Sequence, residues 1–344
     1  MSSLRILIAR PDRIGDVVLS TAIPREVKRE YPDSYVVMLV REQTKDIFLH
    51  NPLVNEVITL DENGVEKSFS HLLMEIRSFS FTHAFMLLPN ERINWLLFLS
   101  SIPNRVGVGH KLYQFLAFTK YVDRKKYIEN RHESDYCLDM IRKLGIEPRS
   151  IVPEIYLSDA EKQEAENFRR SISSEKKIIG INTTSGGSTA NLPLTEYSQL
   201  IKKLSAMKNI QVVVTDYNVP EQIENIPGVL FPVKNTSLRK LIKVVATLDI
   251  LISASTGPMH VAAALKIPTL SVFCPLPACS PNLWGPLGNK SEVILPEANY
   301  CSNVCPGDPK KCAFEGAGGI NHKNILTSLN KIFPELRINA ESIL

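Results

Sequence analysis

Short apolar runs alternate with segments of helical spacing along residues 4–108 of the chain. Runs rich in Ile, Val and Leu predict buried strands at 4–9, 35–40, 54–60, 83–88 and 105–108. Apolar residues three and four positions apart predict helices near 17–30, 43–50, 67–78 and 92–100. Because strands and helices alternate, we expect a parallel sheet with helices on both faces, which binds ligands beyond the carboxyl ends of its strands.

The alternation weakens at 110–131, where basic and aromatic residues mix. One interpretation is a partly helical, solvated charged face. The other is a surface for an anionic amphiphile, whose phosphates contact Lys and Arg and whose apolar parts contact the aromatic rings. A helix over 134–144, with Gly145 as its C-cap, is predicted to close this half of the chain.

A second series follows the connection at 151–174, a short extended piece and a charged helix. Its predicted strands lie at 177–183, 211–215, 229–232, 250–254 and 269–274, and its helices near 194–208, 220–225, 238–248, 259–265 and 323–333. We therefore expect Rossmann-like domains at 1–157 and 177–330, a linker helix at 158–176, and a segment at 331–344 that packs back across the linker. Clefts between two such domains commonly hold a two-substrate site.

Composition narrows the class of protein. The 344 residues carry a formal net charge of +4, too small for this length to indicate a nucleic-acid binder. No apolar run reaches the roughly 18 residues of a membrane-spanning helix, and the first residues enter a strand without a signal-peptide pattern. We expect a cytoplasmic protein whose six cysteines are reduced thiols.

The stretch 253–264 joins a predicted strand to a helix of small residues. At such a turn the first N–H groups of the helix, a hydroxyl and a glycine can converge on a phosphate. The alternative is an ordinary strand-to-helix turn with a serine N-cap and an alanine-packed helix. The residues of the turn alone do not separate the two.

Three ordered segments carry a family resemblance. They are Ile6-Leu7-Ile8-Ala9-Arg10 continued by Asp12-Arg13-Ile14-Gly15-Asp16-Val17-Val18-Leu19-Ser20, then Ser185-Gly186-Gly187-Ser188, then Ser255-Thr256-Gly257-Pro258-Met259-His260. Shorter matches, such as Asn104-Arg105-Val106-Gly107 and His132-Glu133, lie between them. Over residues 4–330 the chain resembles the ADP-heptose:lipopolysaccharide heptosyltransferases, glycosyltransferase family 9.

The resemblance implies an α/β fold of GT-B architecture, in which two Rossmann-like domains with parallel sheets face each other across a cleft. It implies inverting transfer of a heptose from ADP-heptose to a lipid-linked core oligosaccharide, without metal, cofactor or nucleic acid. It also implies peripheral contact with the cytoplasmic face of the inner membrane.

Inversion requires a base that takes the proton of the acceptor hydroxyl as the hydroxyl attacks the anomeric carbon. Asp16 matches the aspartate to which the family assigns this role, and its alternative is an N-cap of the helix that starts at Val17. The acceptor-binding residues that we assign with the resemblance are Arg10, Arg13, Gly15, Asn90, Arg124, Lys125 and Lys126.

The leaving group is a diphosphate, so without a metal the donor domain has to supply positive potential. The donor-binding residues that we assign with the resemblance are Thr184, Ser185, Gly186, Gly187, Ser188, Glu221, Ser255, Thr256, Gly257, Pro258, Met259 and His260. Alternatives stay open for some of them. The loop 185–188 can be a flexible turn, Glu221 a solvated residue at a helix start, and His260 a helix residue hydrogen-bonded in the domain interface.

Three departures qualify the resemblance. Ala190, Asn191 and Leu192 stand where relatives usually carry a cation and a tryptophan, so a phosphate-facing cation is missing locally. Two alternatives stay open: Arg10, Arg13 or Lys234 supplies the missing charge, or the donor binds more weakly. Ser255 replaces the aspartate of many relatives, and the stretch 215–221 replaces a Gly-rich turn. Alternative functions are therefore transfer of a different nucleotide sugar and non-catalytic binding of a nucleotide or glycolipid.

Three cysteines and a histidine near the carboxyl end form a candidate zinc or iron site. They are Cys301, Cys305, Cys312 and His322. Because their spacing is irregular and includes no Cys-x-x-Cys pair, we expect no metal there.

Overall fold

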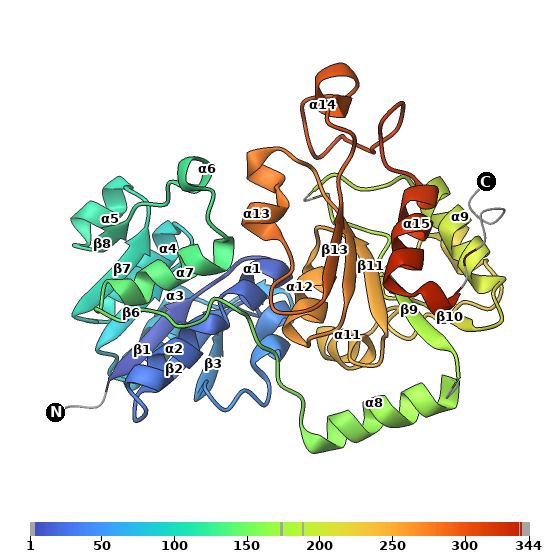
Figure 1. Ribbon diagram of the computed structural model, residues 1–344. Helices are drawn as coiled ribbons and strands as arrows, with labels where there is room; N and C mark the ends of the chain where they lie inside the picture. Colours follow the sequence, from blue (N-terminus) through green and yellow to red (C-terminus); the bar gives the residue numbers. More distant parts are fainter. Residues whose placement is uncertain (1–3, 173–174, 188, 337, 339–344) are drawn as a thin grey trace. The chain divides into compact units, whose positions relative to one another are not determined.

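Six parallel strands form one sheet in the first half of the chain (Figure 1). They are β1 (Arg5–Ala9), β2 (Tyr35–Val40), β3 (Glu56–Thr59), β6 (His83–Met86), β7 (Asn104–Val108) and β8 (Lys120–Val122). The order β3-β2-β1-β6-β7-β8 is that of a Rossmann fold and reverses direction between β1 and β6. Residues that follow these two strands therefore lie where such sheets bind ligands.

The computed structural model describes residues 4–172, 175–187, 189–336 and 338. It divides into two units, Met1–Tyr156 and Leu157–Leu344, called unit 1 and unit 2 below.

Helices cover both faces of the sheet of unit 1. On one face α3 (Phe69–Ser78) and α4 (Glu91–Leu99) bury apolar side chains against Leu7, Val37 and Ala84. On the other face α1 (Ile14–Leu19) and α2 (Ala22–Glu30) pack against α7 (Glu133–Arg142) (Figure 1). The remaining elements are the 3-10 helix η1 (Glu42–Phe48), the hairpin β4 (Asp61–Glu62) and β5 (Val65–Glu66), α5 (Leu112–Leu116) and α6 (Lys126–Glu129).

The single helix predicted over 17–30 is wrong, because it is divided into α1 and α2. The hydroxyls of Ser20 and Thr21 donate to the carbonyls of Val17 and Val18 at 2.7 Å, and Pro24 offers no N–H to the following turn. The strand β8 was not predicted, because only one of its three residues is buried and it carries no apolar run.

Five parallel strands form the sheet of unit 2. They are β9 (Lys177–Ile181), β10 (Ile210–Val214), β11 (Ile250–Ala254), β12 (Thr269–Val272) and β13 (Ser291–Ile294), in the order β10-β9-β11-β12-β13. The strand order reverses between β9 and β11, which makes this the switch point of unit 2. The strand predicted at 229–232 is wrong: Leu230 forms one bridge to Val213, and Gly228 and Pro232 bound the segment.

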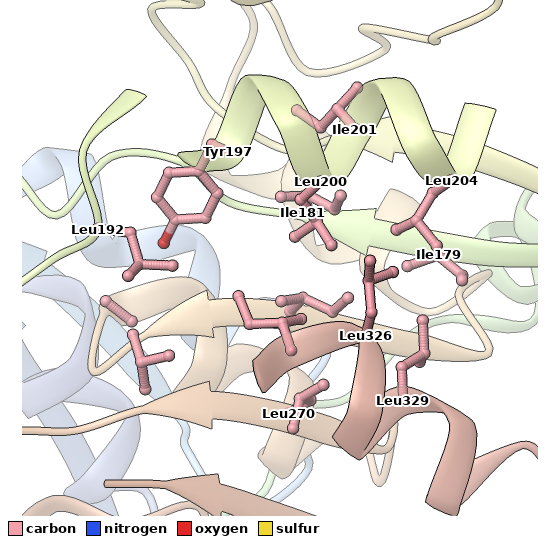
Figure 2. Close-up of a cluster of buried hydrophobic side chains, with 14 of the residues drawn as sticks. Ile179, Ile181, Leu192, Tyr197, Leu200, Ile201, Leu204, Leu270, Leu326 and Leu329 are labelled. Carbon is pink, nitrogen blue, oxygen red and sulfur yellow. The ribbon is translucent and has the colours of Figure 1, made fainter. Parts of the chain in front are cut away.

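The core of unit 2 lies between its sheet and two helices, α9 (Leu194–Ser205) and α15 (His322–Ile332). Figure 2 shows Leu200 and Leu204 of α9 above Ile181 and Ile179 of β9, with Leu326 and Leu329 of α15 below them. The helical spacing of apolar residues in α9 places them on one face, so they enter the core together.

The opposite face of this sheet carries α11 (Leu238–Val245) and α12 (Gly257–Ala264), and α11 packs on α8 (Asp159–Ile172). A buried ion pair joins α8 to α11: Arg239 Nε donates to Glu161 Oε1 at 2.7 Å. The helix expected as a linker thus belongs to unit 2. The remaining elements are α10 (Glu221–Glu224), η2 (Pro277–Cys279), α13 (Pro281–Trp284), α14 (Tyr300–Asn303) and η3 (Pro334–Leu336).

Among the helices in the described ranges, none combines the length and the apolar character needed to cross a membrane.

Candidate active-site residues in the two units

Arg10, directly after β1, is the centre of a buried charged cluster in unit 1. Its side chain is 2% exposed. Its Nη2 donates to Asp16 Oδ1 at 2.9 Å and to Glu133 Oε1 at 3.2 Å. Its Nη1 donates to the carbonyl of Leu87, which follows β6, and its Nε lies 3.1 Å from Asp12 Oδ2. Arg10 therefore bridges the two strands of the switch point.

The cluster keeps Arg10 charged. Burial lowers the pKa of Arg10, but the nearby carboxylates of Asp12, Glu133 and Asp16 raise that pKa by more, and the net change is upward. Burial also raises the pKa of Asp12, although Arg10 opposes this. A permanent guanidinium charge thus lies next to the carboxylate of Asp16.

Asp16 is the most exposed carboxylate of this cluster, at 24% against 10% for Asp12 and zero for Glu133. Arg10 holds its Oδ1, whereas its Oδ2 has no hydrogen bond to any residue that the structure describes. The alternative of an N-cap is wrong, because α1 begins at Ile14 and its N-cap is Arg13. Asp16 lies in the first turn of α1, where the helix dipole favours a carboxylate.

Arg124 supports the same cluster from the other side. Its Nη1 donates to Glu133 Oε1 at 2.8 Å, and its side chain is buried. Glu133, the first residue of α7, thus lies between the guanidinium groups of Arg124 and Arg10. Arg124 does not present its charge to solvent, in contrast to the exposed Lys125.

The other predicted acceptor residues lie at the starts of helices. Arg13 is exposed, and Gly15 is the second residue of α1. Asn90 caps α4, since its side chain accepts a hydrogen bond from the N–H of Ile93 at 2.9 Å. Lys126 is the first residue of α6, and its side chain lies outside the described part of the chain.

A polar cavity of about 320 Å³ lies at the carboxyl edge of the sheet of unit 1. Arg41 Nε donates to the carbonyl of Pro11 at 2.9 Å, and Arg92 Nη1 lies 3.0 Å from Glu66 Oε1. The cavity is lined by Pro11, Arg41, Leu60, Asp61, Gly64, Glu66, Asn90, Arg92 and Ile93. Its guanidinium and amide groups suit a polar, oxygen-rich ligand.

In unit 2 the buried carboxylate of Asp216, which follows β10, holds the loop after β9. It accepts hydrogen bonds from Asn182 Nδ2 at 2.8 Å, from the N–H and hydroxyl of Thr183 at 2.9 Å each, and from those of Thr184 at 3.0 and 2.5 Å. Burial raises the pKa of Asp216, and the hydrogen bonds from Thr184 and Thr183 oppose this rise. The loop backbone at the switch point is therefore fixed in position.

The turn before α12 has the geometry of an anion site. Its N-cap is Thr256, not a serine, and the hydroxyl of Thr256 donates to Asn182 Oδ1 at 3.2 Å and does not cap the helix. The first N–H groups of α12, at Gly257 and Met259, thus have no side-chain cap, and Pro258 carries no N–H. Ser255 is half-buried, whereas the side chains of Met259 and His260 are buried.

The loop after Thr184 contains two adjacent glycines with positive φ. Gly186 and Gly187 have φ of +56° and +66°, a backbone region that favours glycine. The hydroxyl of Ser185 donates to the carbonyl of Thr189 at 3.5 Å, and Ser188 lies outside the described residues. Glu221 is the exposed first residue of α10.

The positions of the missing cation face inward. Ala190 and Leu192 belong to the hydrophobic core of unit 2, so a long cation at either place would replace core packing. Of the suggested substitutes, Arg10 is enclosed by carboxylates and Lys234 is paired with Glu224. Arg13 is exposed and makes no ion pair within the described ranges.

The suspected metal ligands have other contacts. His322 Nδ1 lies 2.7 Å from Glu196 Oε2, and Cys312 lies in the core beside the hydroxyl of Tyr300. In the part of the chain that the structure describes, no three His, Cys, Asp or Glu side chains are grouped so that they could hold a metal ion.

Sequence reasoning assigned no role to Asn182, Asp216 or Glu133. A signal existed for the first two, because each polar side chain follows a strand within two residues. Glu133 gave only a weak signal, as part of a two-residue family match.

The family description "glycosyltransferase family 9 (heptosyltransferase)" matches residues 86–311. The chain belongs to this family and is a glycosyltransferase. Lipopolysaccharide heptosyltransferase 2 of Escherichia coli K12 is 25% identical, over 96% of this chain and 98% of that protein.

Two solved structures share the fold. A family 9 glycosyl transferase from Veillonella parvula has a TM-score of 0.79 at 21% identity and covers 96% of this chain and 97% of its own. The E. coli heptosyltransferase WaaC with ADP has a TM-score of 0.68 at 15% identity and covers 95% and 99%. The expected architecture of two Rossmann-like domains is confirmed.

Proposed function

We propose that this glycosyltransferase moves a heptose from ADP-heptose to the inner core of lipopolysaccharide, with inversion and without a metal or cofactor. The observation that carries the proposal is the carboxylate of Asp16, which lies at the switch point with Oδ1 held by Arg10 and Oδ2 available. In this position Asp16 takes the proton of the acceptor hydroxyl during the attack. The enzyme works at the cytoplasmic face of the inner membrane.

Unit 2 binds the donor in this proposal. The uncapped N–H groups of α12 and the loop held by Asp216 face the pyrophosphate, with Thr256 and His260 beside it. The structure of WaaC with ADP, which shares this fold, supports a nucleotide diphosphate ligand. Ser255 and Glu221 then contact the sugar and ribose.

Unit 1 binds the lipid-linked acceptor in this proposal. Arg13, Gly15, Asn90 and the polar cavity beside Asn90 contact the sugar hydroxyls and acidic groups. Arg10 and Arg124 do not contact the acceptor but position Asp16, because both guanidinium groups are buried against carboxylates.

The proposal is tested by ADP release from ADP-heptose with a heptose-deficient core lipid as acceptor. We expect release that needs both substrates, continues in excess EDTA and yields a product of inverted anomeric configuration. If turnover occurs only with another nucleotide sugar, that sugar and not ADP-heptose is the donor. Saturable nucleotide binding without turnover on any acceptor would overturn the catalytic proposal.

Replacement of Asp216 tests the donor loop. In Asp216→Ala the N–H groups of Thr183 and Thr184 lose their acceptor, so the loop at the switch point loosens. We expect the Kd for ADP to rise about tenfold, equivalent to about 1.4 kcal/mol, in isothermal titration calorimetry. Glu166→Ala, at an exposed position of α8 in unit 2 to which no role is assigned, is the matched control for a change of charge. Unchanged ADP affinity in Asp216→Ala would show that the loop held by Asp216 does not belong to the donor site.

A further inference from the structure

The segment from α5 to α6 exposes an unusual amount of apolar surface. Six of the fifteen exposed large apolar side chains in the described part of the chain lie in this segment: Leu112, Phe115, Leu116, Phe118, Tyr121 and Ile128. Four of them, Leu112, Phe115, Phe118 and Ile128, are between 73% and 82% exposed. Leu112, Phe115 and Leu116 stand at helical spacing and share one side of α5. We call these six residues the apolar face.

The apolar face does not arise from loose attachment, because polar groups fix the inner side of the same segment. Gln114 is buried and its Nε2 donates to the carbonyl of Val108 at 3.0 Å. The hydroxyl of Thr119 donates to Asn94 Oδ1 at 2.8 Å. The polar residues thus point toward the interior of unit 1 and the apolar residues toward solvent, which is the reverse of an ordinary surface helix.

Positive charge predominates around the apolar face, because the two exposed carboxylates of the segment, Asp123 and Glu129, lie 3.9 Å from His110 Nε2 and 3.2 Å from Arg131 Nη1. Lys111, Lys120 and Lys125 are exposed, and none of them pairs with an acidic side chain among the residues that the structure describes. By contrast, the nearby Arg124 and Arg131 are neutralised by Glu133 and Asp135. Unpaired lysines around exposed aromatic and aliphatic side chains complement a negatively charged, partly apolar partner.

We propose that the apolar face and its three lysines dock unit 1 on an anionic lipid bilayer. Phe115, Phe118 and their neighbours enter the boundary between headgroups and acyl chains, and the lysines contact lipid phosphates. A bilayer is favoured over a second protein because exposed apolar side chains extend over α5, β8 and α6 and not into a defined pocket. The inference rests on the proposed function and extends it. The experiment measures vesicle binding and needs no turnover, so the two proposals can fail separately.

The test is sedimentation of the full chain with phosphatidylglycerol–phosphatidylethanolamine vesicles, with phosphatidylcholine vesicles as the neutral reference. We expect binding to the anionic vesicles that weakens as salt rises. Phe115→Ser/Phe118→Asn should weaken binding about tenfold or more. Asn is chosen at 118 because it tolerates the positive φ of 52° found there. Lys111→Gln/Lys120→Gln/Lys125→Gln should weaken binding to a similar extent and remove its dependence on salt.

Matched controls keep the test specific. Met74→Ser changes an exposed apolar residue of α3, and Lys208→Gln/Lys290→Gln/Lys310→Gln removes the same charge from unit 2. Both controls should bind like the wild type, and all variants should keep the circular dichroism of the wild type. The proposal would be overturned if the wild-type protein does not bind anionic vesicles. It would also be overturned if the variants of the apolar face and of its three lysines bind as well as the controls. A wild-type dimer that only the variants of the apolar face convert to monomers would also overturn the proposal, since the apolar face would then join two copies of the chain.

Discussion

An Asp16→Asn variant should transfer sugar about 10²–10⁴-fold more slowly than the wild type while it binds the nucleotide with unchanged affinity. Asparagine keeps the shape of aspartate and can still accept the hydrogen bond from Arg10 Nη2, but it cannot take up a proton. The loss should therefore appear in kcat, because the missing proton transfer belongs to the transition state. Steady-state ADP release and a nucleotide titration measure the two quantities.

Asp12→Asn is the matched control. Asp12 also contacts Arg10 but is more buried than Asp16, so it is not placed to meet an acceptor hydroxyl. If Asp16→Asn transfers at the normal rate, or if Asp12→Asn loses as much kcat while folded, Asp16 is not the base.

Glu133→Ala should lower the free energy of unfolding of unit 1 by about 3–5 kcal/mol. Glu133 is fully buried between two buried guanidinium groups, and its removal leaves their charges insufficiently compensated. Glu133→Gln should lie between this variant and the wild type, since it keeps the volume of the side chain and loses the charge. Urea denaturation of the whole chain measures the change.

The two tryptophans make this measurement specific to one unit. Trp95 lies in α4 of unit 1 and Trp284 in α13 of unit 2. In a Trp284→Phe background the fluorescence of Trp95 reports unit 1 alone. Glu129→Ala, which breaks an exposed pair with Arg131, should change stability by no more than about 1 kcal/mol. Equal effects of Glu133→Ala and Glu129→Ala would contradict the role of burial.

Sequence reasoning predicted the sheets and the two switch-point turns because both depend on local patterns. An apolar run ends at Ala9 and another at Ala254, and each is followed by glycine and polar residues that form the turn. The boundaries were less well predicted where side chains compete with the backbone, as Ser20 and Thr21 do between α1 and α2.

The charged clusters could not be predicted from the sequence. Arg10 and Glu133 are 123 positions apart, and Thr184 and Asp216 are 32 apart, so no local spacing links them. Their pairing follows from strand order, which brings the ends of distant strands to one edge. The sequence therefore predicted Asp16 as the candidate base but also predicted that Arg124 binds the acceptor, because no local pattern indicates that Glu133 neutralises Arg124.

Each sheet takes all its strands from its own unit, and every hydrogen-bonded strand pair in either sheet is parallel. During synthesis, unit 1 therefore has every strand it needs as soon as it has left the ribosome, before unit 2 is complete. N-terminal domains of multidomain chains generally fold first in this way. The buried cluster around Arg10 can then close while translation continues, and a nascent chain stalled late enough for Tyr156 to have left the ribosome should already protect the chain around Arg10 and Glu133 from protease.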